Sequence, residues 1–324
     1  MTEANFLPAR LGVVLNPLSG RIRRRLAKVR HCLDALPSAD VREVSTFSGI
    51  DAALQSFAAE QIDLLVVIGG DGTVQMVLTC LFESKPFAAL PVLAVIPAGT
   101  TNMTALDLGV HGSPIRALRR LQRWLQKPVA PRLVKRRAVH IRQSGCPDIY
   151  GMFFGAGAIT GGVRYSQNRK RMSGIIGELA TGIAVLRFLF DMLIGRTSPI
   201  ITPVKIRLLG RDGDGQDRSC LFLLGSTLER LLLGMRPYWG EEDAPLHVTW
   251  VSESPTRFWR SLPLLVAGRG KRITAHDDYY SSNVRILEVI MDDYFIVDGE
   301  RHLAESRNGP LRLETTEPVT FLVP

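Results

Sequence analysis

The glycine-rich stretch Gly69-Gly70-Asp71-Gly72-Thr73 has residue types that could bind a phosphate group. It joins a short apolar run, Leu64 to Ile68, to a segment with apolar residues at helical spacing. This pattern predicts a buried strand, a tight turn and a helix. Glycine lets a ligand approach the backbone, and a helix start offers unpaired N–H groups with partial positive charge. Those properties suit an anion, although a tight turn without a ligand has the same sequence.

Two carboxylates near the other end of the chain could do acid–base chemistry. They are Asp298 and Glu300, on either side of Gly299 and directly after the apolar run Phe295-Ile296-Val297. A carboxylate on a rigid element can accept the proton of an alcohol during a transfer reaction. Asp-Gly is also a common turn sequence, so this motif by itself leaves an ordinary turn open.

The first third of the chain alternates apolar strands with amphipathic helices. Strands are expected over Leu11 to Leu15, Val41 to Val44, Leu64 to Ile68 and Pro91 to Ile96. This order predicts a parallel sheet with helices on both faces, in which ligands bind at the carboxyl ends of the strands. Several candidate residues follow such ends: Asn16, Thr46, the Gly69–Thr73 loop and Thr100.

After Lys127 the sequence reads as a second, β-rich domain. Strands are expected over Ile201 to Leu208, Ser219 to Leu224, Leu246 to Val251 and Val284 to Met291, with one helix over Phe258 to Val266. We therefore expect an α/β domain over residues 1–128 and a β-rich domain over 129–310. A terminal strand, within residues 311–324, is expected to return to the first domain.

Composition restricts the partners. The chain has 324 residues, an apolar share of 46% and a net charge of +9, which favours nucleotides, nucleic acid or acidic lipid. Its four cysteines are scattered and form no CxxC pair, which argues against a disulfide framework or a zinc site. The N-terminal residues lack the apolar region of a signal peptide. The basic residues are not interleaved with aromatic ones, so we expect no nucleic-acid partner.

Three segments could contact a membrane. Residues 174–194 are mostly apolar but contain Glu178, Arg187 and Asp191, so an amphipathic helix is better supported than a spanning one. Basic residues precede it between Arg164 and Arg171, and another basic helix face is expected over residues 21–30. The apolar loop 231–239 could line an entrance for an acyl chain. Each segment could equally be an ordinary packed or solvated element.

Four motifs occur in order along the chain. They are Asn16-Pro17-Leu18-Ser19-Gly20, Gly69-Gly70-Asp71-Gly72-Thr73, Pro97-Ala98-Gly99-Thr100-Thr101-Asn102 and Asp298-Gly299-Glu300. This set resembles the diacylglycerol kinase catalytic-domain family, which includes bacterial lipid kinases, sphingosine kinases and ceramide kinases. The resemblance implies an ATP-binding α/β domain, a β-rich second domain and a cleft between them for a lipid alcohol.

The resemblance also implies roles for single residues. Gly69, Gly70, Asp71, Gly72, Thr73, Val74 and Gln75 would surround the nucleotide phosphates, and Asp71 would bind the nucleotide or help to place Mg²⁺. Thr46 and Thr100 would contact ATP, and Asn16 would shape the first turn. Ser19, Gly99 and Asn102 belong to the same nucleotide site. Asp298 and Glu300 match the catalytic acidic pair, of which one serves as general base.

The chain also departs from the family pattern. Met76 and Met103 stand where the family usually has Glu and Asp, and Asp243-Ala244-Pro245-Leu246-His247 replaces an Asp-Gly-x-Leu-Asp motif. These changes leave the metal ligands undefined and make an accessory metal site doubtful. They also leave open a catalytically impaired nucleotide- or membrane-binding regulator.

The sequence thus predicts a lipid kinase that uses ATP and Mg²⁺, located in the cytoplasm and peripherally on the inner face of the membrane. Its expected partners are a membrane lipid substrate, such as diacylglycerol, ceramide or a sphingoid base, and an anionic membrane surface. The acceptor lipid and the oligomeric state are not defined by the sequence. A nicotinamide-nucleotide kinase, which shares the GGDG motif, is the alternative enzyme.

Overall fold

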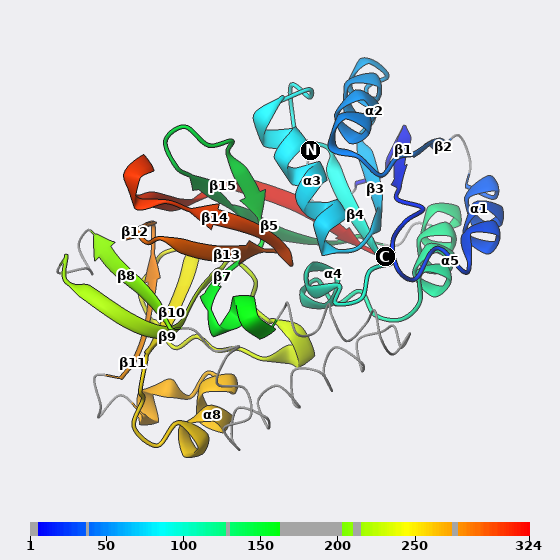
Figure 1. The fold of residues 1–324 in the computed structure, drawn as a ribbon. Helices are drawn as coiled ribbons and strands as arrows, with labels where there is room; N and C mark the ends of the chain where they lie inside the picture. Colours follow the sequence, from blue (N-terminus) through cyan, green and yellow to red (C-terminus); the bar gives the residue numbers. More distant parts are fainter. Residues whose placement is uncertain (1–5, 37–38, 128–129, 163–202, 210–214, 274–277) are drawn as a thin grey trace. The chain divides into compact units, whose positions relative to one another are not determined.

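The computed structural model describes residues 6–36, 39–127, 130–162, 203–209, 215–273 and 278–324 (Figure 1). The expected amphipathic helix over residues 174–194 and the basic residues before it lie outside these ranges. The chain divides into two compact units. The first comprises the chain up to Arg136 together with Glu317–Pro324, and the second lies between Arg137 and Thr316.

The first unit contains the predicted parallel sheet. Its strand order is β15-β4-β3-β1-β2, and every neighbouring pair is parallel. Four strands carry the bounds β1 (Leu11–Leu15), β2 (Ala39–Glu43), β3 (Leu64–Gly69) and β4 (Val92–Pro97). The chain's last strand, β15 (Leu311–Val323), reaches β4 through the pairing of Phe321 with Leu93. Every residue of β1 and β3 is buried, as their uninterrupted apolar runs predict.

Helices cover both faces of this sheet (Figure 1). On one face α2 (Phe47–Ala59) packs against α3 (Asp71–Glu83), and on the other α1 (Leu26–Asp34) packs against α5 (Pro114–Gln126). A short helix that the sequence analysis missed, α4 (Met103–Asp107), follows β4. It has only five residues, too few for a periodic apolar pattern.

The second unit is rich in antiparallel strands, which confirms the predicted β-rich domain. Its strand order is β14-β13-β7-β9-β8-β12-β15, with β10 and β11 beside β9, and β5 and β6 beside β15. The bounds are β5 (Arg132–Arg142), β6 (Ile149–Gly151), β7 (Phe153–Gly157), β8 (Val204–Leu209), β9 (Asp217–Ser226), β10 (Leu246–Ser252), β11 (Tyr279–Val284), β12 (Ile286–Ile290), β13 (Asp293–Val297) and β14 (Glu300–Ala304). Helix α8 (Phe258–Val266) has the predicted bounds, and short 3-10 turns lie at Leu232–Gly234, Gly270–Arg272 and Ser306–Asn308.

The strand expected over Val284 to Met291 is confirmed as β12, with its start shifted to Ile286 because the chain changes strand partners at Arg285. The residues up to Val284 belong to β11, which pairs with β10, whereas β12 pairs with β8 and β15. The chain therefore changes neighbours at Arg285, and the apolar residues on either side of it do not reveal which strands they pair with. Strands β6 and β7 were also missed.

Among the residues that the structure describes, none of the helices has the length and apolar character of a membrane-spanning segment.

Candidate functional site

The strand order of the first unit creates a natural ligand-binding position. From β1 the chain runs outward to β2 and then returns to β3 on the other side of β1. The loops that follow β1 and β3 therefore leave in opposite directions, and open parallel sheets bind ligands at such a switch point. The loops at this position are Asn16–Gly20 and Gly69–Thr73, two of the motifs that the sequence singled out.

Hydrogen bonds connect these loops to each other and to the loop after β4. The Asn16 side-chain amide donates to Thr73 Oγ1 at 2.9 Å, and its Oδ1 accepts the N–H of Leu18 at 3.0 Å. The N–H of Arg21 donates to the carbonyl of Ala98 at 2.9 Å. Three separate segments thus form one connected set of loops at the carboxyl edge of the sheet.

Close packing around these loops leaves no room for a side chain at their glycines. A Cβ atom on Gly99 would lie 2.4 Å from the Cα of Gly70, and one on Gly70 would lie 2.9 Å from the Cα of Gly99. A Cβ atom on Gly69 would lie 2.3 Å from the Cβ of Thr73. The absence of side chains at Gly70 and Gly99 therefore lets the β3–α3 and β4–α4 loops touch directly. These glycines are needed for that contact whether or not a ligand is bound.

Asp71 is buried at the start of α3, and its carboxylate holds the start of α4. Its Oδ1 accepts the N–H of Thr104 at 3.2 Å, and the N–H groups of Asn102 and Met103 also contribute hydrogen bonds. Burial raises the pKa of this carboxyl group, and the backbone hydrogen bonds oppose that shift. In this structure Asp71 links two loops of the site, which is a positioning role that the motif alone does not reveal.

Asn102 closes the loop after β4. It has a left-handed backbone conformation with φ of 51°, its Oδ1 accepts the N–H of Gly99 at 2.7 Å, and its amide donates to the carbonyl of Gly99 at 3.0 Å. Asparagine adopts this conformation more readily than most residues. The Pro97–Asn102 motif therefore encodes a fixed turn that ends beside Gly70.

The remaining predicted nucleotide residues occupy different environments. Thr46 is exposed and caps α2, where its Oγ1 accepts the N–H of Gly49 at 3.2 Å. Thr100 is half-buried, Ser19 is buried in the first loop, and Val74 and Gln75 are buried within α3. Val74 is part of the apolar core, so its side chain packs in the interior and does not face a ligand.

The acidic pair lies in the second unit, on the turn between β13 and β14. Val297 pairs with Glu300, so Asp298 and Gly299 are the two turn residues, with φ of 49° and 94°. Two-residue hairpins of this hand favour Asp-Gly because both positions need positive φ. The structure therefore explains the Asp-Gly sequence by the turn geometry alone.

The two carboxylates of this turn have different surroundings. Asp298 is buried, and its oxygens accept the N–H groups of Met152 at 2.8 Å and Phe153 at 3.0 Å. Glu300 is exposed, and within the described part of the chain no hydrogen bond or ion pair holds its carboxylate. Asp298 is thus a structural acceptor, whereas the carboxylate of Glu300 is available to another molecule. Sequence reasoning could not separate the two, because the donors are backbone groups 145 and 146 residues away.

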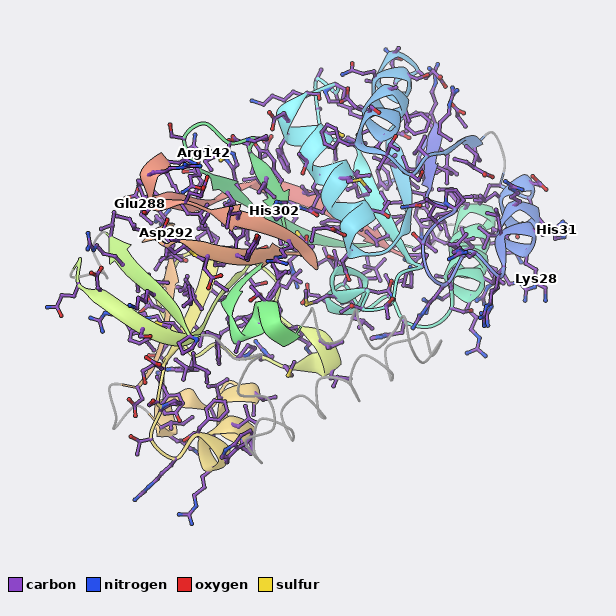
Figure 2. The ribbon with its side chains drawn as sticks, viewed as in Figure 1. Lys28, His31, Arg142, Glu288, Asp292 and His302 are labelled. Atoms are coloured by element: carbon purple, nitrogen blue, oxygen red, sulfur yellow. The ribbon has the colours of Figure 1, made fainter. Side chains whose placement is uncertain are left out.

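His302, labelled in Figure 2, follows Glu300 by two residues in β14, and the alternation of side chains along a strand puts the two on one face. Its ring stacks on Phe295 with 5.4 Å between centroids, and its Nε2 atom is buried without a hydrogen-bond partner among the described residues. Burial lowers the pKa of His302 below its ordinary value of 6.5, because the imidazolium form is poorly solvated there.

We expect this histidine to make the protein less stable in acid. The unfolded chain binds a proton near pH 6.5 and the folded chain only at lower pH, so stability falls as the pH decreases below about 6.5. One proton limits the slope to about 1.4 kcal/mol per pH unit. Urea unfolding at pH 7.5 and pH 5.5 should show a larger loss for the wild type than for His302→Phe, which keeps the aromatic stacking. Equal losses for the two proteins would contradict this expectation.

The comparisons with known proteins agree with these features. The family model described as diacylglycerol kinase catalytic domain matches residues 10–131. A curated diacylglycerol kinase of Bacillus subtilis (strain 168) is 35% identical over 105 residues, which cover 31% of this chain and 33% of the relative's length. The matched stretch thus spans about a third of that relative's length.

The whole chain also resembles a solved protein in its fold. The crystal structure of a diacylglycerol kinase from Bacillus anthracis str. Sterne matches with a TM-score of 0.63 and 16% identity, covering 99% of this chain and 98% of that one. At this identity the likeness concerns the two-domain fold. Residues 10–131 are thus similar in sequence to the diacylglycerol kinase catalytic domain, and the rest of the chain shares the fold of such a protein.

Proposed function

We propose that this protein is an ATP-dependent lipid kinase, which transfers the γ-phosphoryl group of ATP to a hydroxyl of a membrane lipid such as diacylglycerol, ceramide or a sphingoid base. The observation that carries the proposal is the set of connected loops at the switch point of the first unit, within the part of the chain that matches the kinase family. We further propose a cytoplasmic protein that works peripherally on the inner face of the membrane.

The loops suit a nucleotide triphosphate. Helix α3 has 13 residues and begins directly after Gly70, so its first N–H groups and its dipole favour bound phosphate. The start of α3 lies directly against the β4–α4 loop, because neither Gly70 nor Gly99 has a side chain that would keep them apart. The loop Asn16–Gly20 is followed in the sequence by four arginines between Arg21 and Arg25, which add positive charge near this loop.

The metal is proposed to arrive with the nucleotide. In the described residues, no group of three or more His, Cys, Asp and Glu side chains is arranged to hold a metal ion. Mg²⁺ commonly needs only one or two carboxylates when substrate phosphates supply other ligands. When bound, it would neutralise charge on the transferring phosphoryl group. Of the acidic residues discussed, Glu300 has the exposed carboxylate, whereas those of Asp71 and Asp298 already accept backbone hydrogen bonds.

The proton of the lipid hydroxyl needs an acceptor, and we assign this role to Glu300. An alcohol is a poor nucleophile until a base removes its proton. The exposed carboxylate of Glu300 can receive a proton, while Asp298 holds the turn on the backbone of Met152 and Phe153. The oxygen of the alcohol then attacks the γ-phosphorus, and ADP leaves with the bridging oxygen.

Radiolabelled ATP tests the proposal directly. The purified protein is incubated with γ-labelled ATP and Mg²⁺, with either a total lipid extract or NAD as the acceptor, and the labelled products are separated. We expect label in a lipid. Label in NADP instead would indicate a nicotinamide-nucleotide kinase, and ATP binding without transfer to either acceptor would indicate a regulator without catalysis.

A further inference from the structure

A concentration of unpaired positive charge lies on the helix pair α1 and α5. Eight exposed basic residues lie on these helices or directly beside them: Arg23, Arg24, Arg25, Lys28, Arg116, Arg119, Arg123 and Lys127. We call this set the basic face. Helix α5 has no acidic residue, and α1 has one, Asp34.

The two helices form a single surface. They pack against each other on one side of the sheet of the first unit, and the Gln122 side chain donates to the carbonyl of Cys32 at 2.5 Å. Their apolar residues point inward, including Val29 and Leu33 of α1 and Leu118 and Leu121 of α5. Figure 2 shows Lys28 and His31 projecting from α1 away from the sheet.

The cations of the basic face are not neutralised by the protein. In the described residues none of the eight forms an ion pair, whereas the nearby Arg30 is paired with Glu43 at 2.6 Å. Holding many like charges on one surface costs free energy by mutual repulsion, and an anionic partner would remove that cost. The basic face therefore fits a partner with a high density of negative charge.

We infer that the basic face docks the protein on a bilayer that contains anionic lipids. This inference rests on the proposed function, because a lipid acceptor lies in a bilayer. Leu18, in the loop before the basic residues, is 66% exposed, and an exposed apolar residue beside cations suits an interface of headgroups and acyl chains. A nucleic acid fits less well, because the aromatic residue of α5, Trp124, is buried and cannot stack on bases.

Vesicle sedimentation tests the inference without using catalysis. The variant Lys28→Gln, Arg116→Gln, Arg119→Gln, Arg123→Gln removes four cations from the basic face. The matched control Arg260→Gln, Arg269→Gln, Arg272→Gln, Arg285→Gln removes four exposed cations from the second unit. The probes are phosphatidylcholine vesicles with and without phosphatidylglycerol. Circular dichroism and thermal unfolding check that both variants are folded.

We expect the wild type and the control to sediment with the phosphatidylglycerol vesicles and to remain in solution with phosphatidylcholine alone. Each basic residue beside an anionic surface changes binding by about fivefold, so removing four of them should weaken binding on the order of several hundredfold. Raising the salt concentration should release the wild type. Binding that is equal for wild type and basic-face variant, lost only in the control, or stronger to duplex DNA than to vesicles would overturn the inference.

A kinase assay separates this inference from the proposed function. With a lipid acceptor dispersed in uncharged detergent, the basic-face variant should phosphorylate as fast as the wild type, and with anionic vesicles it should be slower. Normal vesicle binding by an inactive wild type would reject the kinase and keep the docking surface. Equal activities of both proteins on vesicles would reject the docking surface and keep the kinase.

Discussion

Glu300→Gln should reduce lipid phosphorylation by at least about a hundredfold and leave the fold unchanged. General bases contribute on the order of 10²- to 10⁴-fold to such reactions, and glutamine cannot accept the proton. Glu300 is exposed and its carboxylate has no hydrogen-bond or ion-pair partner in the described chain, so the replacement breaks no such interaction there. The rate of transfer at saturating ATP and acceptor, together with the melting temperature, measures both effects. The matched control is Glu253→Gln, an exposed glutamate outside the acidic turn.

Asp298→Asn should have the opposite pattern of effects, in which the protein loses stability and only part of its activity. An asparagine in this place offers one oxygen where the carboxylate offers two, and its amino group would face a backbone N–H of Met152 or Phe153. Leaving a buried donor without a partner costs about 1–3 kcal/mol, so we expect a lower melting temperature and a partial loss of activity. A fully stable but inactive Asp298→Asn protein, beside an active Glu300→Gln protein, would reverse the two roles.

Gly99→Ala should disrupt ATP binding. The added Cβ atom would lie 2.4 Å from the Cα of Gly70, and neither backbone can rotate away as a side chain could. The β3–α3 and β4–α4 loops would have to separate, at a cost of about 1–3 kcal/mol if it resembles overpacking in a core. If the bound state carries that cost, affinity falls roughly 5- to 150-fold. Titration of the protein with ATP, followed by calorimetry, gives the change directly.

The control for Gly99→Ala is Gly225→Ala, in which the new Cβ atom would lie no closer than 3.7 Å to any other atom. This variant should bind ATP as the wild type does. Unchanged ATP affinity in Gly99→Ala would show that contact between the two loops is not required for the nucleotide. Loss of affinity in both variants would point to a general effect of substitution rather than to the loops.

The sequence predicted the strands of the first unit closely because each is a short apolar run bounded by turn residues. The runs at Leu11 and Leu64 became β1 and β3, and both are fully buried. Parallel strands covered on two faces need such continuous apolar character, so this signal is strong. In the second unit the same reasoning found β12 but placed its start before Arg285, the residue at which the chain changes strand partners.

The sequence also defined which loops belong to the candidate site, since residues after parallel strands meet at one edge of the sheet. It did not reveal why the glycines of two loops are needed, because Gly70 and Gly99 touch only after β3 and β4 pair. In the same way, the partners of Asp71 are N–H groups of residues 102–104. Backbone groups of distant residues carry no signature in the sequence.

Residue types and spacing by themselves gave the family resemblance, the alternation of elements in the first unit and the candidate residues. Only the tertiary structure decided which of those residues are buried and hydrogen-bonded and which are exposed. Asp298 is buried, with its carboxylate accepting hydrogen bonds from two backbone N–H groups, whereas Glu300, two positions away, is exposed. The tertiary structure also brought the cations of α1 and α5, about 90 residues apart in the chain, onto one surface. The reason is that burial, hydrogen bonding and charge density depend on neighbours in space, and these neighbours are far apart in the chain.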